Sequence, residues 1–294
     1  MADAETRVKH LSIWRGDVSI EILSGGVSNA SFVVTDSTGR YVARVGEDYA
    51  VHQVSRQREA IAARAAFTAG LSPEVIHVEP GIMIVRHLAA QTYGEADVRA
   101  NMEACVDLVA RCHRDMGARI GGQGAIFWVF QILRDYAQTL TGAHHRHTCD
   151  MARWMTIVTH LEAVQIPMPI IFGHHDLLPT NFMDDGSRLW LIDWEYGAFG
   201  TAMFDLANLA AANSFSDHDE TAMLAQYFGS AVDQTKRRAF FAMKVAAALR
   251  EAMWGMISEI YLKAPGVDYA AYAEEHLSRF NGIFKIYEQR FGVS

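Results

Sequence analysis

The segment 173–209, GHHDLLPTNFMDDGSRLWLIDWEYGAFGTAMFDLANL, places three oxygen-bearing side chains at fixed intervals. Asn181 follows Asp176 by five residues, and Asp193 follows Asn181 by twelve. A carboxylate such as Asp176 can orient and deprotonate a hydroxyl group. The oxygens of Asn181 and Asp193 are hard ligands that suit Mg²⁺ on nucleotide phosphates. The segment therefore predicts phosphoryl transfer.

The alternative is that these residues only cap turns, which is the commonest role of a loop Asp or Asn taken alone. The combined spacing favours a catalytic segment over three unrelated caps. The apolar residues 189–192 ahead of Asp193 predict a short strand. Such a strand would present Asp193 from a rigid end.

The elements that must position this segment differ between the two parts of the chain. Residues 1–88 contain short alternating apolar runs separated by Gly and Asp turns, which are typical of strands, and one Ala-rich helix that stops at Gly70. We expect strands at 18–23, 31–35, 41–45, 75–78 and 81–85 and a helix at 54–69. This predicts a five-stranded sheet with one helix after its third strand.

The remaining residues, 89–294, show apolar side chains at helical spacing around the compact segment 170–194. Helices are expected near 102–116, 127–140, 151–164, 202–212, 220–228, 234–262 and 269–290. The predicted fold class is therefore α+β. Its two domains are a sheet part, 1–88, and a mainly helical part, 89–294.

The order of motifs resembles the choline/ethanolamine kinase family of the aminoglycoside-phosphotransferase-like, protein-kinase-like superfamily. The resemblance is carried by HxDxxxxN at 174–181, IDWEY at 192–196 and FDLA at 204–207. It implies a two-lobe kinase-like fold with a small antiparallel sheet lobe and a larger helical lobe. It also implies transfer of the γ-phosphoryl group of ATP, with Mg²⁺, to choline, ethanolamine or a similar small amino alcohol.

For the nucleotide, the resemblance implies a covering loop, a cationic residue on the third strand and an adenine hinge after the fifth. Arg44 has the place of the cationic residue, where protein kinases have Lys and many choline kinase relatives have Arg, and Glu59 is its expected partner. The predicted nucleotide-binding residues are Gly25, Gly26, Ser28, Asn29, Arg44, Glu59, Arg86 and Leu88. Glycines in the covering loop would let backbone N–H groups approach the phosphates.

In the catalytic segment, the resemblance implies that Asp176 is the base and that Asn181 and Asp193 hold Mg²⁺. His174 and Asp205 are expected to support the loop from behind. His175 has no obvious partner, and we expect it to be an exposed loop residue.

The acceptor site is expected to use Glu195, Tyr196 and Trp254, since a trimethylammonium group is bound by aromatic faces and a carboxylate. Glu195 could serve the metal instead, and Trp254 could be a core residue of its helix. Two positions depart from eukaryotic choline kinases: Ile257 replaces a second Trp, and Ala212 replaces a Glu. These departures leave ethanolamine or another small amino alcohol open.

Composition adds limits on partners and location. The net charge is −8, distributed as −1 over 1–88 and −7 over 89–294, which argues against nucleic acid and weakly favours a cationic substrate. Three cysteines without CxxC spacing indicate reduced thiols, so we expect a cytoplasmic protein without a signal peptide or membrane span. A homodimer is left open.

Three other functions remain open at this point. A same-fold kinase could act on an aminoglycoside, a sugar or thiamine. A pseudokinase could bind nucleotide without transfer, although Asp176, Asn181 and Asp193 are all present. A metal-dependent hydrolase could use the histidines of 143–147, for which a solvated loop is the expectation.

Overall fold

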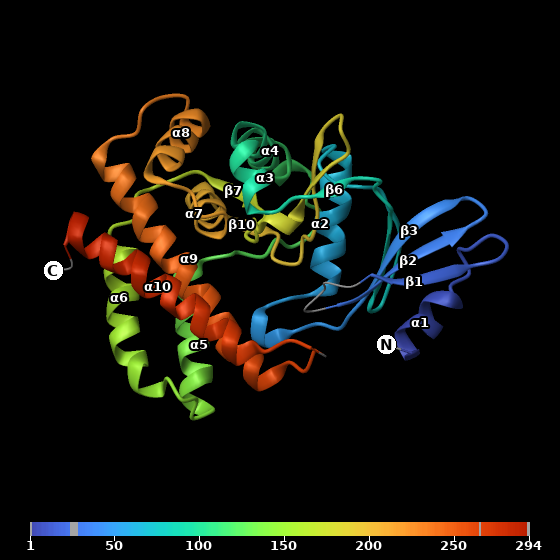
Figure 1. Ribbon diagram of the computed structural model, residues 1–294, viewed down its shortest axis with the longest axis horizontal. Helices are drawn as coiled ribbons and strands as arrows, with labels where there is room; N and C mark the ends of the chain where they lie inside the picture. Colours follow the sequence, from blue (N-terminus) through green and yellow to red (C-terminus); the bar gives the residue numbers. More distant parts are fainter. Residues whose placement is uncertain (1, 24–28, 265, 293–294) are drawn as a thin grey trace.

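The sheet is the first part of the chain and has five antiparallel strands in the order β1-β2-β3-β5-β4 (Figure 1). The computed structural model describes residues 2–23, 29–264 and 266–292. The strands are β1 (Ser19–Leu23), β2 (Ala30–Asp36), β3 (Gly39–Val45), β4 (Val75–Glu79) and β5 (Ile82–Arg86). All five predicted strands are present, with bounds that differ by one or two residues.

One face of the sheet is covered by a short helix that the sequence did not predict, α1 (Ala2–Lys9). Val8 of this helix is buried in a cluster with Phe32, Ala43 and Ile84 of the sheet. Four of its eight residues are charged, so its pattern gives little helical signal beyond the single buried position. Packing against the sheet accounts for this helix better than its intrinsic propensity does.

Helix α2 (Arg56–Thr68) lies between the sheet and the helical part of the molecule (Figure 1). Its buried side chains are mostly alanines, which allow close packing, together with Glu59. The helix is followed by Gly70, whose φ of +71° a residue with a Cβ rarely adopts. The predicted stop at this glycine is confirmed.

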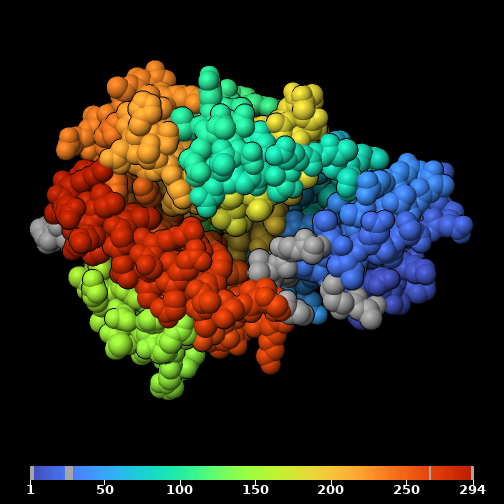
Figure 2. Space-filling view, in the orientation of Figure 1, coloured from blue at the N-terminus to red at the C-terminus, as the bar shows by residue number. Residues whose placement is uncertain are grey.

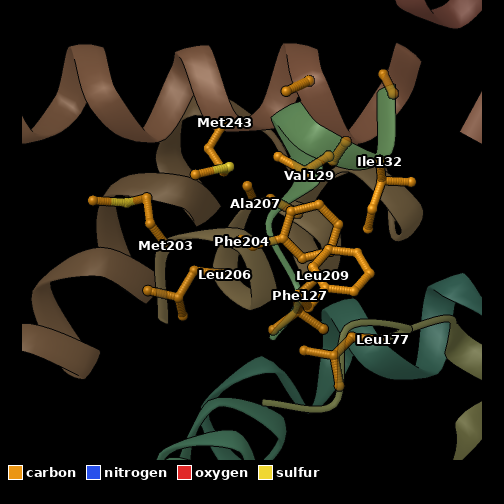
Figure 3. Close-up of a cluster of buried hydrophobic side chains, with 14 of the residues drawn as sticks. Phe127, Val129, Ile132, Leu177, Met203, Phe204, Leu206, Ala207, Leu209 and Met243 are labelled. Carbon is orange, nitrogen blue, oxygen red and sulfur yellow. The ribbon is translucent and has the colours of Figure 1, made fainter. Parts of the chain in front are cut away.

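The helical part is built around α9 (Gln234–Tyr261), which is buried over most of its length, and its neighbours α7 and α10. Its helices are α3 (Glu95–Ala100), α4 (Met102–Asp115), α5 (Val129–Gly142), α6 (Met151–Ala163), α7 (Ala202–Ala212), α8 (Asp217–Phe228) and α10 (Tyr269–Phe291). Figure 3 shows Phe127, Phe204 and Leu209 packed together in this core, with Leu177 of the catalytic segment beside them. This apolar base supports the loop that carries Asp176.

Two small sheets hold the catalytic segment. One pairs β7 (Ile170–Gly173) with β10 (Ala198–Thr201), and the other joins β6 (Gln91–Thr92), β8 (Phe182–Asp184) and β9 (Leu189–Leu191). The sequence indicated two strands in 170–194, and the structure has three there. Figure 2 shows one part of this yellow segment set back between the teal and red regions, and another part protruding at the top of the view.

The predicted α+β class, a five-stranded antiparallel sheet followed by a mainly helical part, is confirmed. The division at residue 88 stays a prediction, since α2 shares its buried alanines with the larger hydrophobic cluster. Within the described residues, no helix is both long and apolar enough to cross a membrane.

Candidate active site

The predicted catalytic loop, residues 174–181, is bound by the buried carboxylate of Asp205, in the first turn of α7. Its Oδ2 accepts the backbone N–H of His174 at 2.8 Å, and its Oδ1 accepts that of His175 at 2.7 Å. Nε2 of His113 also donates to Oδ2, at 2.8 Å. Burial acts to raise the pKa of Asp205, but the neighbouring His175 and His113 outweigh burial, and the pKa lies below its ordinary value.

His174 packs under the segment that carries Asp193. Its Nε2 donates to the backbone carbonyl of Ile192 at 2.9 Å, and its ring meets Trp194 edge to face. His174 therefore connects the loop before Asp176 to the residue before Asp193.

The prediction for His175 is wrong, because this side chain is fully buried. Its ring stacks on Phe127 with 4.3 Å between centroids, and its Nδ1 donates to the carbonyl of Tyr196 at 3.2 Å. Burial lowers its pKa to about 4, so the ring is neutral near pH 7. A Cβ on Gly173 or Gly200 would lie less than 3 Å from this ring, so the neighbouring glycines leave the space it fills.

Asp176 and Asn181 are in direct contact. Asn181 donates from Nδ2 to the backbone carbonyl of Asp176 at 2.8 Å and to its carboxylate at 3.3 Å. Burial raises the pKa of Asp176 well above its ordinary value, although the nearby Arg250 opposes this. A carboxylate with a raised pKa accepts a proton more readily than an exposed one.

Asp193 lies two residues beyond β9 and forms an ion pair with Arg44 of β3. The Nη2 of Arg44 is 2.6 Å from Oδ1 of Asp193, and its Nη1 is 3.1 Å from Oε1 of Glu59 on α2. Burial acts to raise the pKa of Asp193, but Arg44 outweighs burial and the pKa is lowered. Arg44 therefore pairs both with Glu59, its expected partner, and with Asp193.

Arg56, which was not among the residues predicted from the sequence, extends this ion-pair network. Its Nη1 is 2.7 Å from Oε2 of Glu59 and 3.0 Å from Oε2 of Glu195. The signal for it was the i,i+3 spacing of Arg56 and Glu59 on one helix. Burial raises the pKa of Glu195 to about 7, and the nearby Asp193 acts in the same direction.

A mainly apolar cavity of about 440 Å³ opens beside Arg44 and Asp193. Its walls include Val33, Val42 and Met83 of the sheet and Ile192 of the catalytic segment. The predicted hinge residues Arg86 and Leu88 also line it. The guanidinium of Arg86 is paired with Glu74, so its side chain is already engaged.

The remaining nucleotide-loop predictions fall in different places. Gly25, Gly26 and Ser28 lie outside the described residues. Asn29 and Glu59 line a second cavity of about 740 Å³, whose wall also includes Arg44 and Gly46. Asn29 is therefore separated from the hinge residues, while Arg44 borders both cavities.

The structure brings Tyr196 and Trp254 together, as Nε1 of Trp254 donates to Oη of Tyr196 at 2.9 Å. Groups of the chain itself pack on both rings. Trp254 stacks on His52 with 5.1 Å between centroids, and the guanidinium of Arg250 lies 4.4 Å from the centroid of the Tyr196 ring. Neither His52 nor Arg250 was identified from the sequence, because their partners lie far away in the chain.

The expectation of a solvated histidine loop at 143–147 is wrong in part. His145 is buried and lies 3.4 Å from Glu259, and His147 contacts Asp150 and Glu274. The contacts with Glu259 and Glu274 fasten the loop to α9 and α10. Among the residues that the structure describes, no group of three or more His, Cys, Asp or Glu could hold a metal ion.

Comparisons with known proteins agree with this architecture. A crystal structure of a choline/ethanolamine kinase family protein from Mesorhizobium loti aligns with a TM-score of 0.75 and 26% identity, over 97% of this chain and 95% of that one. The protein LicA of Haemophilus influenzae is 22% identical over 273 residues, which cover 90% of this chain and 79% of LicA. A probable ethanolamine kinase of Arabidopsis thaliana is 26% identical over 65% of this chain and 55% of its own length.

These similarities confirm the predicted kinase-like fold with a sheet lobe and a helical lobe. A family model described as the phosphotransferase enzyme family (APH) matches residues 19–241, which include the sheet, the catalytic loop and the Asp205 support. The chain belongs to this phosphotransferase enzyme family.

Proposed function

We propose that the protein transfers the γ-phosphoryl group of ATP to the hydroxyl group of choline, ethanolamine or a similar small amino alcohol. The transfer class follows from the phosphotransferase family. The acceptor class is supported by the relatives, which include a choline/ethanolamine kinase family protein and a probable ethanolamine kinase. The predicted acceptor residues Glu195, Tyr196 and Trp254 remain part of this proposal.

One observation carries the nucleotide part of the proposal. Arg44 and Asp193, an ion pair of 2.6 Å, both line the 440 Å³ cavity between the sheet and the catalytic segment. Apolar walls of this kind suit a planar base, and a charged pair at one end suits phosphates. We assign the base to the end near Leu88 and the phosphates to Arg44.

The residues present fit Mg²⁺. The amide of Asn181 faces Asp176 with its Nδ2, so its oxygen is the atom left for a metal, and the lowered pKa of Asp193 keeps its carboxylate ionised. Hard oxygen ligands of this kind are those that Mg²⁺ prefers. When bound, Mg²⁺ would neutralise charge on the nucleotide phosphates.

In the proposed reaction, the chain's own residues position the two substrates and move one proton. The carboxylate of Asp176 orients the acceptor hydroxyl and accepts its proton as the hydroxyl oxygen bonds to the γ-phosphorus. The bond from that phosphorus to the β–γ bridging oxygen breaks, and ADP leaves. Asp205 and His174 hold the loop, and Arg44 binds phosphate oxygens.

A screen for acceptor-dependent ADP release tests this function. The panel contains choline, ethanolamine, the intermediate N-methylated amino alcohols and several aminoglycosides, each with ATP and Mg²⁺. We expect ADP release to rise with at least one small amino alcohol and not with aminoglycosides. ADP release only with aminoglycosides would assign the enzyme another hydroxyl acceptor. Absence of ADP release with every acceptor in the panel would indicate a nucleotide-binding pseudokinase.

A further inference from the structure

Arg250 is a buried cation that the proposed reaction does not use. It lies on α9 with 2% of its surface exposed. Its Nη1 donates to the carboxylate of Glu251 at 3.0 Å. Its Nε and Nη2 are buried and have no hydrogen-bond partner among the described residues.

Two unpaired N–H groups on a buried guanidinium are unfavourable. Burying a donor without a partner costs free energy, and the cost is larger when the donor belongs to a charged group. A core residue without another role would be better replaced by an apolar side chain of similar size. The two free donors therefore indicate a ligand that supplies oxygen acceptors.

The surroundings place this cation in the proposed acceptor site. The guanidinium lies over the Tyr196 ring, 4.4 Å from its centroid. Tyr196 in turn holds Trp254 through its hydroxyl. Arg250 thus occupies one face of the Tyr196 ring.

The space beside Arg250 is small. A cavity of about 20 Å³ is lined by Arg250, Tyr136, Glu195 and Tyr196, and neither Asp176 nor Trp254 is among its lining residues. A volume of this size holds about one oxygen-sized group. It suits a hydroxyl or carboxylate oxygen and is too small for three methyl groups.

We propose that Arg250 is a specificity-determining residue, which binds a second oxygen function of the acceptor and keeps quaternary ammonium groups away from Tyr196. The acceptor is then a small amino alcohol with a further hydroxyl or carboxylate besides the hydroxyl that reacts. This inference rests on the proposed function and narrows its substrate class. It predicts that choline is a poor acceptor.

The first test keeps Arg250 unchanged and measures ligand binding, so that the result does not depend on turnover. Calorimetric titrations of the Asp176→Asn protein compare two ligand pairs. Choline is paired with 3,3-dimethylbutan-1-ol, which has the same shape without charge, and ethanolamine with 2-amino-1,3-propanediol, which adds one hydroxyl. We expect choline to bind no more tightly than its uncharged analogue, and the diol to bind about tenfold or more tightly than ethanolamine, as for a hydrogen bond to a charged donor.

Tighter binding of choline than of its analogue, or equal binding of ethanolamine and the diol, would overturn the role of Arg250. Absence of ADP release with every acceptor, with these binding preferences intact, would refute the proposed transfer and leave the binding assignment in place. The two failures are therefore distinguishable.

Substitutions at position 250 provide the second test. Arg250→Lys keeps the charge but loses the Nε and Nη2 donors, so it should remove the preference for the diol and still disfavour choline. Arg250→Met removes the charge and should shift the preference toward choline. Arg237→Met, on the same helix near Thr221, is the matched control and should leave both preferences unchanged. If Arg250→Met does not fold, the Arg250→Lys variant and the two ligand comparisons with the protein that keeps Arg250 still test the role of Arg250.

Discussion

At the scale of single residues, Asp193 has an unusual backbone conformation that its neighbours hold in place. Its φ of +68° lies in the left-handed region, which non-glycine residues seldom adopt and Asp tolerates better than most. Such a conformation costs on the order of 1–3 kcal/mol and persists where the surroundings enforce it. Here Arg44 and the His174 contact to Ile192 fix the residue on both sides.

Asp176→Asn tests the proposed base. The amide keeps the shape of the carboxylate but cannot take a proton, so kcat should fall by about 10² or more while nucleotide affinity stays near that of the wild type. Steady-state kinetics and nucleotide titration check this. Asp3→Asn, an exposed change on α1, is the control, and full turnover by Asp176→Asn would remove Asp176 from the mechanism.

Trp254→Phe tests whether this ring serves the acceptor site. The phenyl ring can still pack beside His52, but it lacks the Nε1–H that holds Tyr196. We expect a several-fold higher KM for the acceptor, on the order of one lost hydrogen bond, with little change in the KM for ATP. Equal acceptor KM values in the variant and the wild type would return Trp254 to a purely structural role.

At the scale of elements, local patterns in the sequence predicted most of the fold. Alternation gave the five strands, and helical spacing gave α7 and α9 within a residue of their observed ends. The missed elements depend on distant contacts. Helix α1 gains its stability from the sheet, and β10 forms because residues 198–201 pair with β7. The sheet strands that pack on α1, and the strand β7 that pairs with β10, are both too far away in the sequence for a local pattern to reveal them.

The same distinction applies to the candidate site. The fixed spacing of Asp176, Asn181 and Asp193 was readable because one loop and one strand end carry them. His175 was misjudged and Arg250 was missed because burial and pairing with distant residues define their roles, whereas Arg56 was missed although its spacing to Glu59 was a local signal. Phe127, Glu195 and Tyr196, which they contact, lie between 21 and 139 residues away.

Gly200→Ala tests the packing of β10 against the catalytic loop. A Cβ there would lie 2.9 Å from the backbone oxygen of Phe127 and 2.8 Å from Nε2 of His175. Since backbone atoms cannot move aside cheaply, we expect a loss of ~1–3 kcal/mol in the free energy of unfolding. Chemical denaturation measures it.

Gly282→Ala is the matched control for this substitution. Gly282 lies within α10, and no atom would come within 4 Å of its new Cβ. The change should raise stability by up to ~1 kcal/mol, because alanine favours helix over glycine. Equal effects of the two substitutions would show that the space around Gly200 is not restrictive.

At the scale of the whole molecule, contacts between distant segments join the sheet lobe to the helical lobe. His52, in the turn Ala50–His52 before α2, lies 2.9 Å from Oη of Tyr136 on α5 and 3.0 Å from Oγ of Ser258 on α9. Burial, with a further contribution from Arg250, lowers the pKa of His52 to about 3. The folded protein therefore keeps this ring neutral.

This pKa predicts how stability depends on pH. Between pH 3 and 6.5 the unfolded chain binds a proton at His52 that the folded protein does not, so stability is complete above about pH 6.5 and falls as the pH drops. The contribution to the slope is at most ~1.4 kcal/mol per pH unit. His52→Gln should flatten the curve measured by urea denaturation between about pH 5 and pH 7.

The exposed His218→Gln on α8 serves as the control and should keep the wild-type slope. An unchanged slope in His52→Gln would mean that His52 contributes no pH dependence in this range.

The anchoring of His52 also restricts how the two lobes can move. A connection fixed to both α5 and α9 cannot separate from the helical lobe without breaking buried hydrogen bonds. We therefore expect any opening of the proposed nucleotide cavity to be a rotation about this pinned edge. This edge lies beside the proposed acceptor residue Trp254, on which His52 stacks, so a rotation about it would leave the aromatic residues around Trp254 in place.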